Sequence, residues 1–160
     1  MKILFLDIDG VLNSRHYDLE RTATDGNIDE SRLPLLKKII EQTGAKIVLS
    51  SSWRKHWNES DALCDEIGKE LNTVFGRYGL KIHGKTADGG IAASRPEEIR
   101  AYLSNLDTQP TSFAILDDVS FGWGELGSFT VVTNHYIGRG LEMRHVDAAI
   151  DILNKKGCKQ

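Results

Sequence analysis

The chain opens with a short apolar segment, residues 2–6, that runs directly into the acidic sequence at residues 7–10. An apolar run of this length, ended by an Asp-Gly turn, is typical of a strand buried on both faces. Similar apolar runs recur at residues 46–49, 113–116 and 129–132. Strands that are apolar throughout belong to parallel sheets covered by helices on each side, so this feature restricts the chain to an α/β fold.

Helical patterns lie between these strands. Apolar residues recur at spacings of three and four in four segments, residues 31–43, 59–72, 94–106 and 146–153. Gly44 supplies a stop after the first of them, and Ser94 with Glu97 forms a capping-box pattern at the third. We therefore expect one domain over residues 1–160, a Rossmann-like parallel sheet with helices on both faces.

Polar side chains follow three of the predicted strands. They are Asp7 and Asp9 after the first, Ser50 and Ser51 after the second, and Asp117 and Asp118 after the third. The carboxyl ends of parallel strands meet at one edge of a sheet, where ligands bind, so these groups should converge. Carboxylates gathered in one site need protons or a cation to neutralise them, and Mg²⁺ is the natural oxygen-seeking partner.

Such a set of groups can transfer a phosphoryl group. An aspartate beside magnesium can attack phosphorus to give an aspartyl-phosphate, and a second acid can protonate the leaving oxygen and then activate water. The phosphoryl oxygens also need a hydroxyl and a cation, for which Ser50 or Ser51 and Arg95 are available.

Residues 6–12, Leu-Asp-Ile-Asp-Gly-Val-Leu, resemble the first motif of the haloacid dehalogenase (HAD) superfamily of phosphatases. Residues 49–51 are similar to its second motif and residues 115–118 to its fourth. The third motif normally supplies a lysine, and Arg95-Pro96 stands in its place. The sequence Ser-Ser-Ser-Trp-Arg at residues 50–54 also looks like the HAD domains grouped with RNA-repair proteins.

The resemblance implies a role for each acid. Asp7 would be the nucleophile and Asp9 the general acid and base. Asp7, the backbone carbonyl of Asp9 and one acid of the fourth motif would hold Mg²⁺. Asp118 is favoured as the direct ligand, because the family's usual Gly-Asp ending places its ligand second, and Asp117 would then stand behind it.

The resemblance also implies the groups that hold the substrate. Ser51 is favoured over Ser50 as the motif serine when one counts from the tryptophan, whereas counting from the strand favours Ser50. Arg95 keeps the charge of the usual lysine but replaces a point ammonium with a planar fork. The expected substrate contacts are Gly10, Ser50, Trp53 and Arg54.

The run Trp53-Arg54-Lys55-His56-Trp57 has two interpretations. It is an ordinary helix start with packed aromatics and solvated charges, or it is a platform on which a base stacks while Arg54 meets a phosphate.

Gly79 to Thr86 match the Walker A pattern letter for letter, which would indicate a nucleotide-binding loop. Residues 80–83 alternate as in a strand, however, and Asp88-Gly89-Gly90 interrupts the helix that should begin there. Because the strand–loop–helix context of a nucleotide-binding loop is missing, the match does not favour an ATPase or a kinase.

The gaps between motifs are too short for a large cap domain, so the active site should be open. An open site suits a phosphate monoester on a large substrate, such as a nucleic-acid end, a nucleotide or a phosphoprotein. The non-enzymatic alternative is a phosphate-binding module that has lost turnover, against which the intact pair Asp7 and Asp9 argues.

Composition restricts the partners and the setting. The formal net charge of −3 lacks the basic excess expected of a protein that coats duplexes. Two cysteines, Cys64 and Cys158, form no disulfide framework, so we expect a reducing, cytoplasmic setting. The first apolar run is too short for a signal peptide or membrane span, and no obligate protein partner is indicated.

Overall fold

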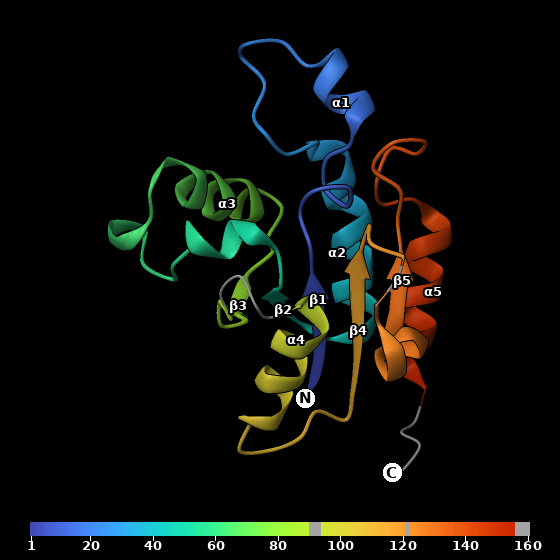
Figure 1. The fold of residues 1–160 in the computed structure, drawn as a ribbon. Coiled ribbons are helices and arrows are strands. Elements are labelled where there is room, and N and C mark those ends of the chain that lie inside the picture. Colours follow the sequence, from blue (N-terminus) through green and yellow to red (C-terminus); the bar gives the residue numbers. More distant parts are fainter. Residues whose placement is uncertain (90–93, 121, 156–160) are drawn as a thin grey trace.

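The computed structural model describes residues 1–89, 94–120 and 122–155. Within these residues the chain forms a parallel sheet of five strands in the order β3-β2-β1-β4-β5, with helices on both faces (Figure 1). The strands are β1 (Lys2–Leu6), β2 (Lys46–Leu49), β3 (Ile82–Lys85), β4 (Ser112–Asp117) and β5 (Thr130–Val132). The α-helices are α1 (Arg15–Glu20), α2 (Leu33–Thr43), α3 (Glu66–Arg77), α4 (Arg95–Ser104) and α5 (Met143–Asn154). The 3-10 helices are η1 (Glu30–Arg32), η2 (Ser52–Lys55), η3 (Asp61–Leu63) and η4 (Gly124–Phe129). The structure confirms the predicted Rossmann-like α/β fold.

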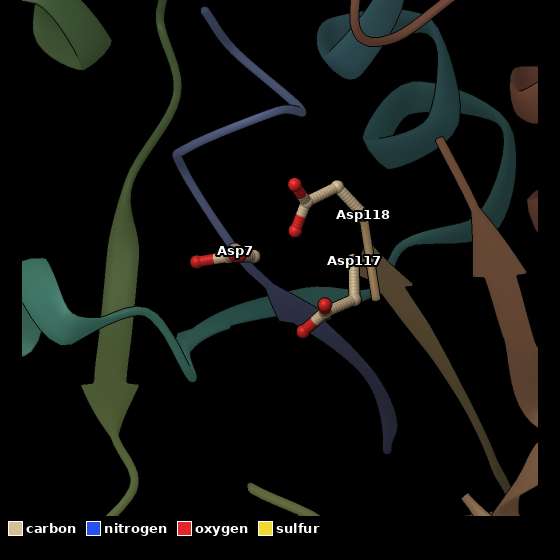
Figure 2. A group of neighbouring side chains, drawn as sticks. All are labelled: Asp7, Asp117 and Asp118. Atoms are coloured by element: carbon tan, nitrogen blue, oxygen red, sulfur yellow. The ribbon is translucent and has the colours of Figure 1, made fainter. Parts of the chain in front are cut away.

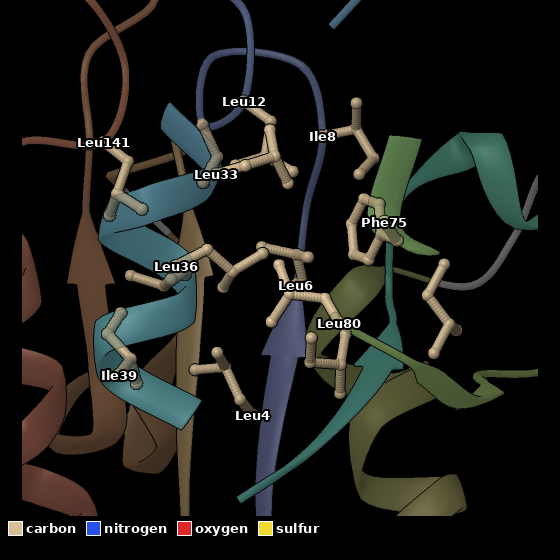
Figure 3. Close-up of a cluster of buried hydrophobic side chains, with 14 of the residues drawn as sticks. Leu4, Leu6, Ile8, Leu12, Leu33, Leu36, Ile39, Phe75, Leu80 and Leu141 are labelled. Atoms are coloured by element: carbon tan, nitrogen blue, oxygen red, sulfur yellow. The ribbon is translucent and has the colours of Figure 1, made fainter. Parts of the chain in front are cut away.

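The central strand β1 contributes to a hydrophobic core on each face of the sheet. Leu4 and Leu6 pack in the larger core with apolar residues of α2, α3 and α5 (Figure 3). Ile3 and Phe5 point the other way and pack with Ile99 of α4 and with η4. Because successive side chains of a strand alternate between faces, a fully apolar β1 requires helices on both sides.

The strand register aligns the polar residues that follow β1 and β2 with those at the end of β4. Leu6 of β1 pairs with Leu49 of β2 and with Leu116 of β4. The next residues continue the pairing, since the Asp7 amide donates to the Leu116 carbonyl at 2.9 Å and the Ser50 amide donates to the Leu6 carbonyl at 3.0 Å. The register therefore brings Asp7, Ser50 and Asp117 together at the carboxyl edge, as predicted.

The helix predicted over residues 59–72 was placed wrongly. The structure has the short η3 and then α3, which begins at Glu66. Asp65 caps α3, since its carboxylate accepts the amides of Ile67 and Gly68 at 3.1 Å. Leu63, expected on the buried face, lies before the cap and is 72% exposed. An N-cap with two hydrogen bonds fixes the helix start more strongly than one additional apolar residue does.

The Walker A match does not form a phosphate-binding loop. Its residues Ile82–Lys85 are strand β3, at the edge of the sheet. The Lys85 ammonium donates to the carbonyls of Arg54 at 2.9 Å and Trp57 at 2.6 Å. Gly90, part of the expected helix break, lies outside the described residues, as does Cys158.

The segment between β1 and α2 holds only the short helices α1 and η1. The sequence did not predict α1, which is capped by Ser14 through a hydrogen bond from the Tyr17 amide at 3.2 Å. The described part of the chain contains no cap domain, as expected. None of its helices has the length and apolar composition needed to cross a membrane.

Candidate active site

Three aspartates meet at the carboxyl edge of the sheet. Asp7 follows β1, Asp117 ends β4, and Asp118 comes directly after it. One carboxylate oxygen from each lies within 4.8 Å of the other two, and Figure 2 shows the three side chains as neighbours at the ends of β1 and β4. We call Asp7, Asp117 and Asp118 the acidic cluster; its hard oxygen donors are close enough to converge on one small cation such as Mg²⁺.

Arg95 closes one side of the acidic cluster. Its Nη1 atom lies 2.7 Å from Asp7 Oδ2 and 2.5 Å from Asp117 Oδ2, so one nitrogen bridges two carboxylates. The residue begins α4, whose first turn is fixed by a 2.7 Å hydrogen bond from the Ser94 amide to Glu97. The capping box thus fixes the start of α4, from which Arg95 reaches the acidic cluster.

Burial and mutual repulsion shape the electrostatics of the acidic cluster. Burial raises the pKa of the Asp7 carboxyl, although the Arg95 charge opposes the rise. Burial likewise raises the pKa of Asp117. The pKa of Asp118 is raised by burial and then by the Asp7 charge. One arginine therefore does not fully compensate three carboxyls, and a bound cation would complete the neutralisation.

The two neighbouring aspartates have different surroundings. Asp117 is fully buried, and its two oxygens accept from Arg95 Nη1 at 2.5 Å and from the Val119 amide at 2.9 Å. Asp118 is partly exposed and lies against Gly10, where a Cβ atom added to the glycine would come within 2.5 Å of the Asp118 Cβ. Gly10 has a φ of 73°, so both its conformation and this close approach favour glycine.

The structure separates the two candidate serines. The Ser51 hydroxyl lies near the Asp7 carboxyl and acts to lower its pKa, against the larger effect of burial. The Ser51 oxygen also accepts the Trp53 amide at 3.3 Å. The Ser50 side chain is also fully buried, but its hydroxyl has no hydrogen-bond partner among the described residues. Ser51, which the tryptophan count favoured, is thus the serine beside the proposed nucleophile.

Asp9 is exposed and lies outside the acidic cluster. The Trp53 indole Nε1 donates to Asp9 Oδ2 at 3.0 Å, and the Asn13 amide Nδ2 donates to Asp9 Oδ1 at 2.9 Å. A stacking platform was one of two interpretations of Trp53, and the structure shows its polar edge bound to Asp9. Asn13 was not predicted from the sequence as a site residue, although it is the first polar residue after the apolar pair that follows Gly10.

The Arg54 guanidinium is engaged by groups within the fold. It is 7% exposed, and its Nη2 pairs with Glu98 of α4 at 2.6 Å. Its Nη1 donates to the carbonyls of Ser50 at 3.1 Å and Ser51 at 3.0 Å. The predicted phosphate contact stays a prediction, and the buried Glu98, remote in sequence, is the carboxylate that the guanidinium binds in this structure. Arg54 instead supports the backbone that carries the two serines.

A parallel α/β sheet with an Asp-x-Asp pair after β1, a serine after β2 and two acids after β4 defines a domain of the HAD superfamily. The chain belongs to the family described as the HAD domain in Swiss Army Knife RNA repair proteins, whose model matches residues 3–146. This family places it in a hydrolase superfamily whose members are generally phosphatases. The comparison with curated proteins found no match.

Proposed function

We propose that the protein is a Mg²⁺-dependent phosphomonoesterase that acts through an aspartyl-phosphate on Asp7. The observation that carries the proposal is the position of Asp7, which contacts Arg95 at 2.7 Å, has the Ser51 hydroxyl nearby and lies in the acidic cluster. A nucleophile for phosphorus needs this combination of a cation, a hydroxyl and nearby ligands for a metal.

The residues present fit a magnesium ion. Asp7, Asp118 and the backbone carbonyl of Asp9 would hold it, and Asp117, whose oxygens are engaged by Arg95 and the Val119 amide, would orient the arginine. When bound, the ion neutralises the carboxylates and the phosphate charge so that the two anions can approach.

The side chains divide the reaction between them. An Asp7 oxygen attacks phosphorus while Arg95 and the Ser51 hydroxyl hold the phosphoryl oxygens. As the ester P–O bond breaks, protonated Asp9 gives its proton to the leaving oxygen and an alcohol departs. Asp9, now a carboxylate, takes a proton from water as that water attacks phosphorus. The bond from Asp7 to phosphorus then breaks, releasing inorganic phosphate and restoring both acids.

We propose a phosphorylated RNA end as the substrate class. Two observations support this choice: the RNA-repair family that matches residues 3–146, and the absence of a cap domain in the described residues. An uncapped site leaves room for a polymer whose terminal phosphate alone enters the acidic cluster, whereas a small metabolite would be poorly enclosed.

The test measures phosphate release from matched substrates with Mg²⁺ or with EDTA. RNA oligonucleotides with a 3′- or a 5′-phosphate are compared with a phosphopeptide and with 4-nitrophenyl phosphate. We expect Mg²⁺-dependent release, with the highest kcat/KM for an RNA end. Phosphate binding without release from any ester would show a silent binding module, and a preference for the phosphopeptide would replace the RNA assignment.

A further inference from the structure

The Asp9 carboxyl is held from two sides by neutral donors. Trp53 Nε1 binds Oδ2 at 3.0 Å, and Asn13 Nδ2 binds Oδ1 at 2.9 Å. Each oxygen therefore has one N–H donor, and the donors come from two separate segments, η2 and the loop after β1. Two donors on different oxygens restrict rotation of the carboxyl plane in an otherwise exposed side chain.

Both donors are themselves anchored. Asn13 is 5% exposed; its Oδ1 accepts the Gly10 amide at 3.0 Å, and its Nδ2 also donates to the Asn27 carbonyl at 3.3 Å. The backbone amide of Trp53 donates to the Ser51 hydroxyl oxygen, and the Trp53 ring packs against the larger core. These contacts restrict the Trp53 and Asn13 side chains to one preferred position. The two side chains in turn restrict the orientation of the Asp9 carboxyl.

We propose that Trp53 and Asn13 are positioning residues that aim the Asp9 carboxyl at the leaving oxygen of the substrate. This inference rests on the proposed function, since it assumes that Asp9 is the acid and base. In the first half-reaction the Asp9 proton passes to the leaving oxygen as its bond to phosphorus breaks. Proton transfer needs the two oxygens within hydrogen-bond reach, so a carboxyl free to rotate would meet that geometry less often.

The positioning role differs from the stacking role that one interpretation of the sequence gave Trp53. A base stacks on the face of an aromatic ring, whereas Asp9 is bound by the indole N–H at the ring edge. Trp53→Phe keeps an aromatic face and removes the N–H. The substitution therefore preserves most of any stacking while it releases one side of Asp9.

The test compares phenyl phosphate with 4-nitrophenyl phosphate, which are similar in size but differ in the leaving group. Nitrophenolate departs without a proton, whereas phenolate leaves far better when protonated. The ratio kcat/KM depends only on the steps up to departure of the leaving group. The later activation of water by Asp9 therefore does not affect the comparison. For Trp53→Phe we expect a loss of about ten- to a hundredfold on phenyl phosphate and less than about threefold on 4-nitrophenyl phosphate.

Trp57→Phe is the matched control, because it deletes an indole N–H that donates to Asn72 at 2.8 Å instead of to Asp9. It should affect the two esters equally. Asn13→Ala removes the other donor and should reproduce the preference of Trp53→Phe, with thermal melting to confirm folding. Equal losses on both esters in Trp53→Phe, or no loss, would overturn the inference while the wild-type activity still supports the proposed function. A wild type that releases phosphate neither from these esters nor from RNA ends would instead reject the function itself.

Discussion

The two aspartates of the first motif are two residues apart yet are held in opposite ways. Asp7 is 3% exposed, lies in the acidic cluster and is paired with Arg95. Asp9 is exposed and is held by the neutral N–H groups of Trp53 and Asn13. Charge surrounds the first carboxyl, and neutral hydrogen bonds surround the second.

This difference matches the two proposed tasks. A nucleophile must remain anionic, and a cation beside it favours the anion. An acid/base must exist in both protonation states during one turnover, and neutral donors orient it without adding a fixed charge to either state. The charged half and the neutral half of the site should therefore respond differently to substitution.

The largest difference should separate Asp7→Asn from Asp9→Asn. Asp7→Asn removes the nucleophile in a nearly isosteric way, and we expect turnover to fall roughly 10⁴-fold or more on every ester. Asp9→Asn should still release about one nitrophenolate per enzyme from 4-nitrophenyl phosphate in a rapid burst, because that step needs no acid, and then turn over slowly. Rapid-mixing absorbance measurements distinguish the two. A burst from Asp7→Asn would refute the aspartyl-phosphate mechanism.

The next effect concerns the cation of the charged half. Arg95→Met should lower kcat/KM by about 10²- to 10³-fold, the range seen when one group that stabilises developing charge is lost. Arg95→Lys restores the superfamily's usual residue and should recover most of that loss. Steady-state kinetics at saturating Mg²⁺ measure both variants. If Arg95→Lys is as impaired as Arg95→Met, the fork that bridges Asp7 and Asp117 matters more than its charge.

The charged half was largely predictable from the sequence because local order determines it. Strands β1, β2 and β4 are short apolar runs, and the parallel register carries Asp7, Ser51 and Asp117 to one edge. Arg95 follows from a local capping box. The start of α3 was missed because Asp65 competes with an apolar pattern that continues across it.

The neutral half, and Arg54 next to Trp53 in the sequence, were not predictable in the same way. The roles of Trp53 and Arg54 depend on partners 44 positions away in the sequence, Asp9 for the indole and Glu98 for the guanidinium. Both residues present an aromatic or basic group after a candidate serine, which is also what a nucleic-acid platform would show. Only the tertiary fold reveals that one binds an acid in the site and the other a buried acid on α4.

A smaller effect distinguishes the two acids after β4. We expect Asp118→Asn to weaken Mg²⁺ affinity at least about tenfold, because Asp118 would bind the ion directly. Asp117→Asn should weaken it less, since its oxygens are engaged by Arg95 and the Val119 amide. Calorimetric titration of each variant with Mg²⁺ alone provides the comparison, and the reverse order would make Asp117 the ligand.

The smallest predicted effect is on thermal stability in EDTA, and it follows from the raised pKa of Asp118. Burial raises the pKa of this carboxyl in the folded state above its ordinary value of 3.8. At pH values between 3.8 and the raised pKa, the folded state therefore binds more protons than the unfolded state. Stability contributed by the protonated form is therefore lost as pH rises through the folded pKa. Asp118→Asn cannot ionise, so it should melt a few degrees above the wild type at pH 8, the shift that about 1 kcal/mol produces in a chain of this length.

That advantage of Asp118→Asn should shrink as the pH falls toward 4, and it should vanish below 3.8, where the wild-type carboxyl becomes protonated in both states. Saturating Mg²⁺ at pH 8 should reverse the order, since the ion binds the folded wild type more tightly than the variant. Comparing the two proteins at each pH cancels the other carboxyls, such as Asp65, whose pKa is lowered by His56 and contributes with the opposite sign. A melting difference that stays constant from pH 4 to 8 would show that the pKa of Asp118 is not raised in the folded state.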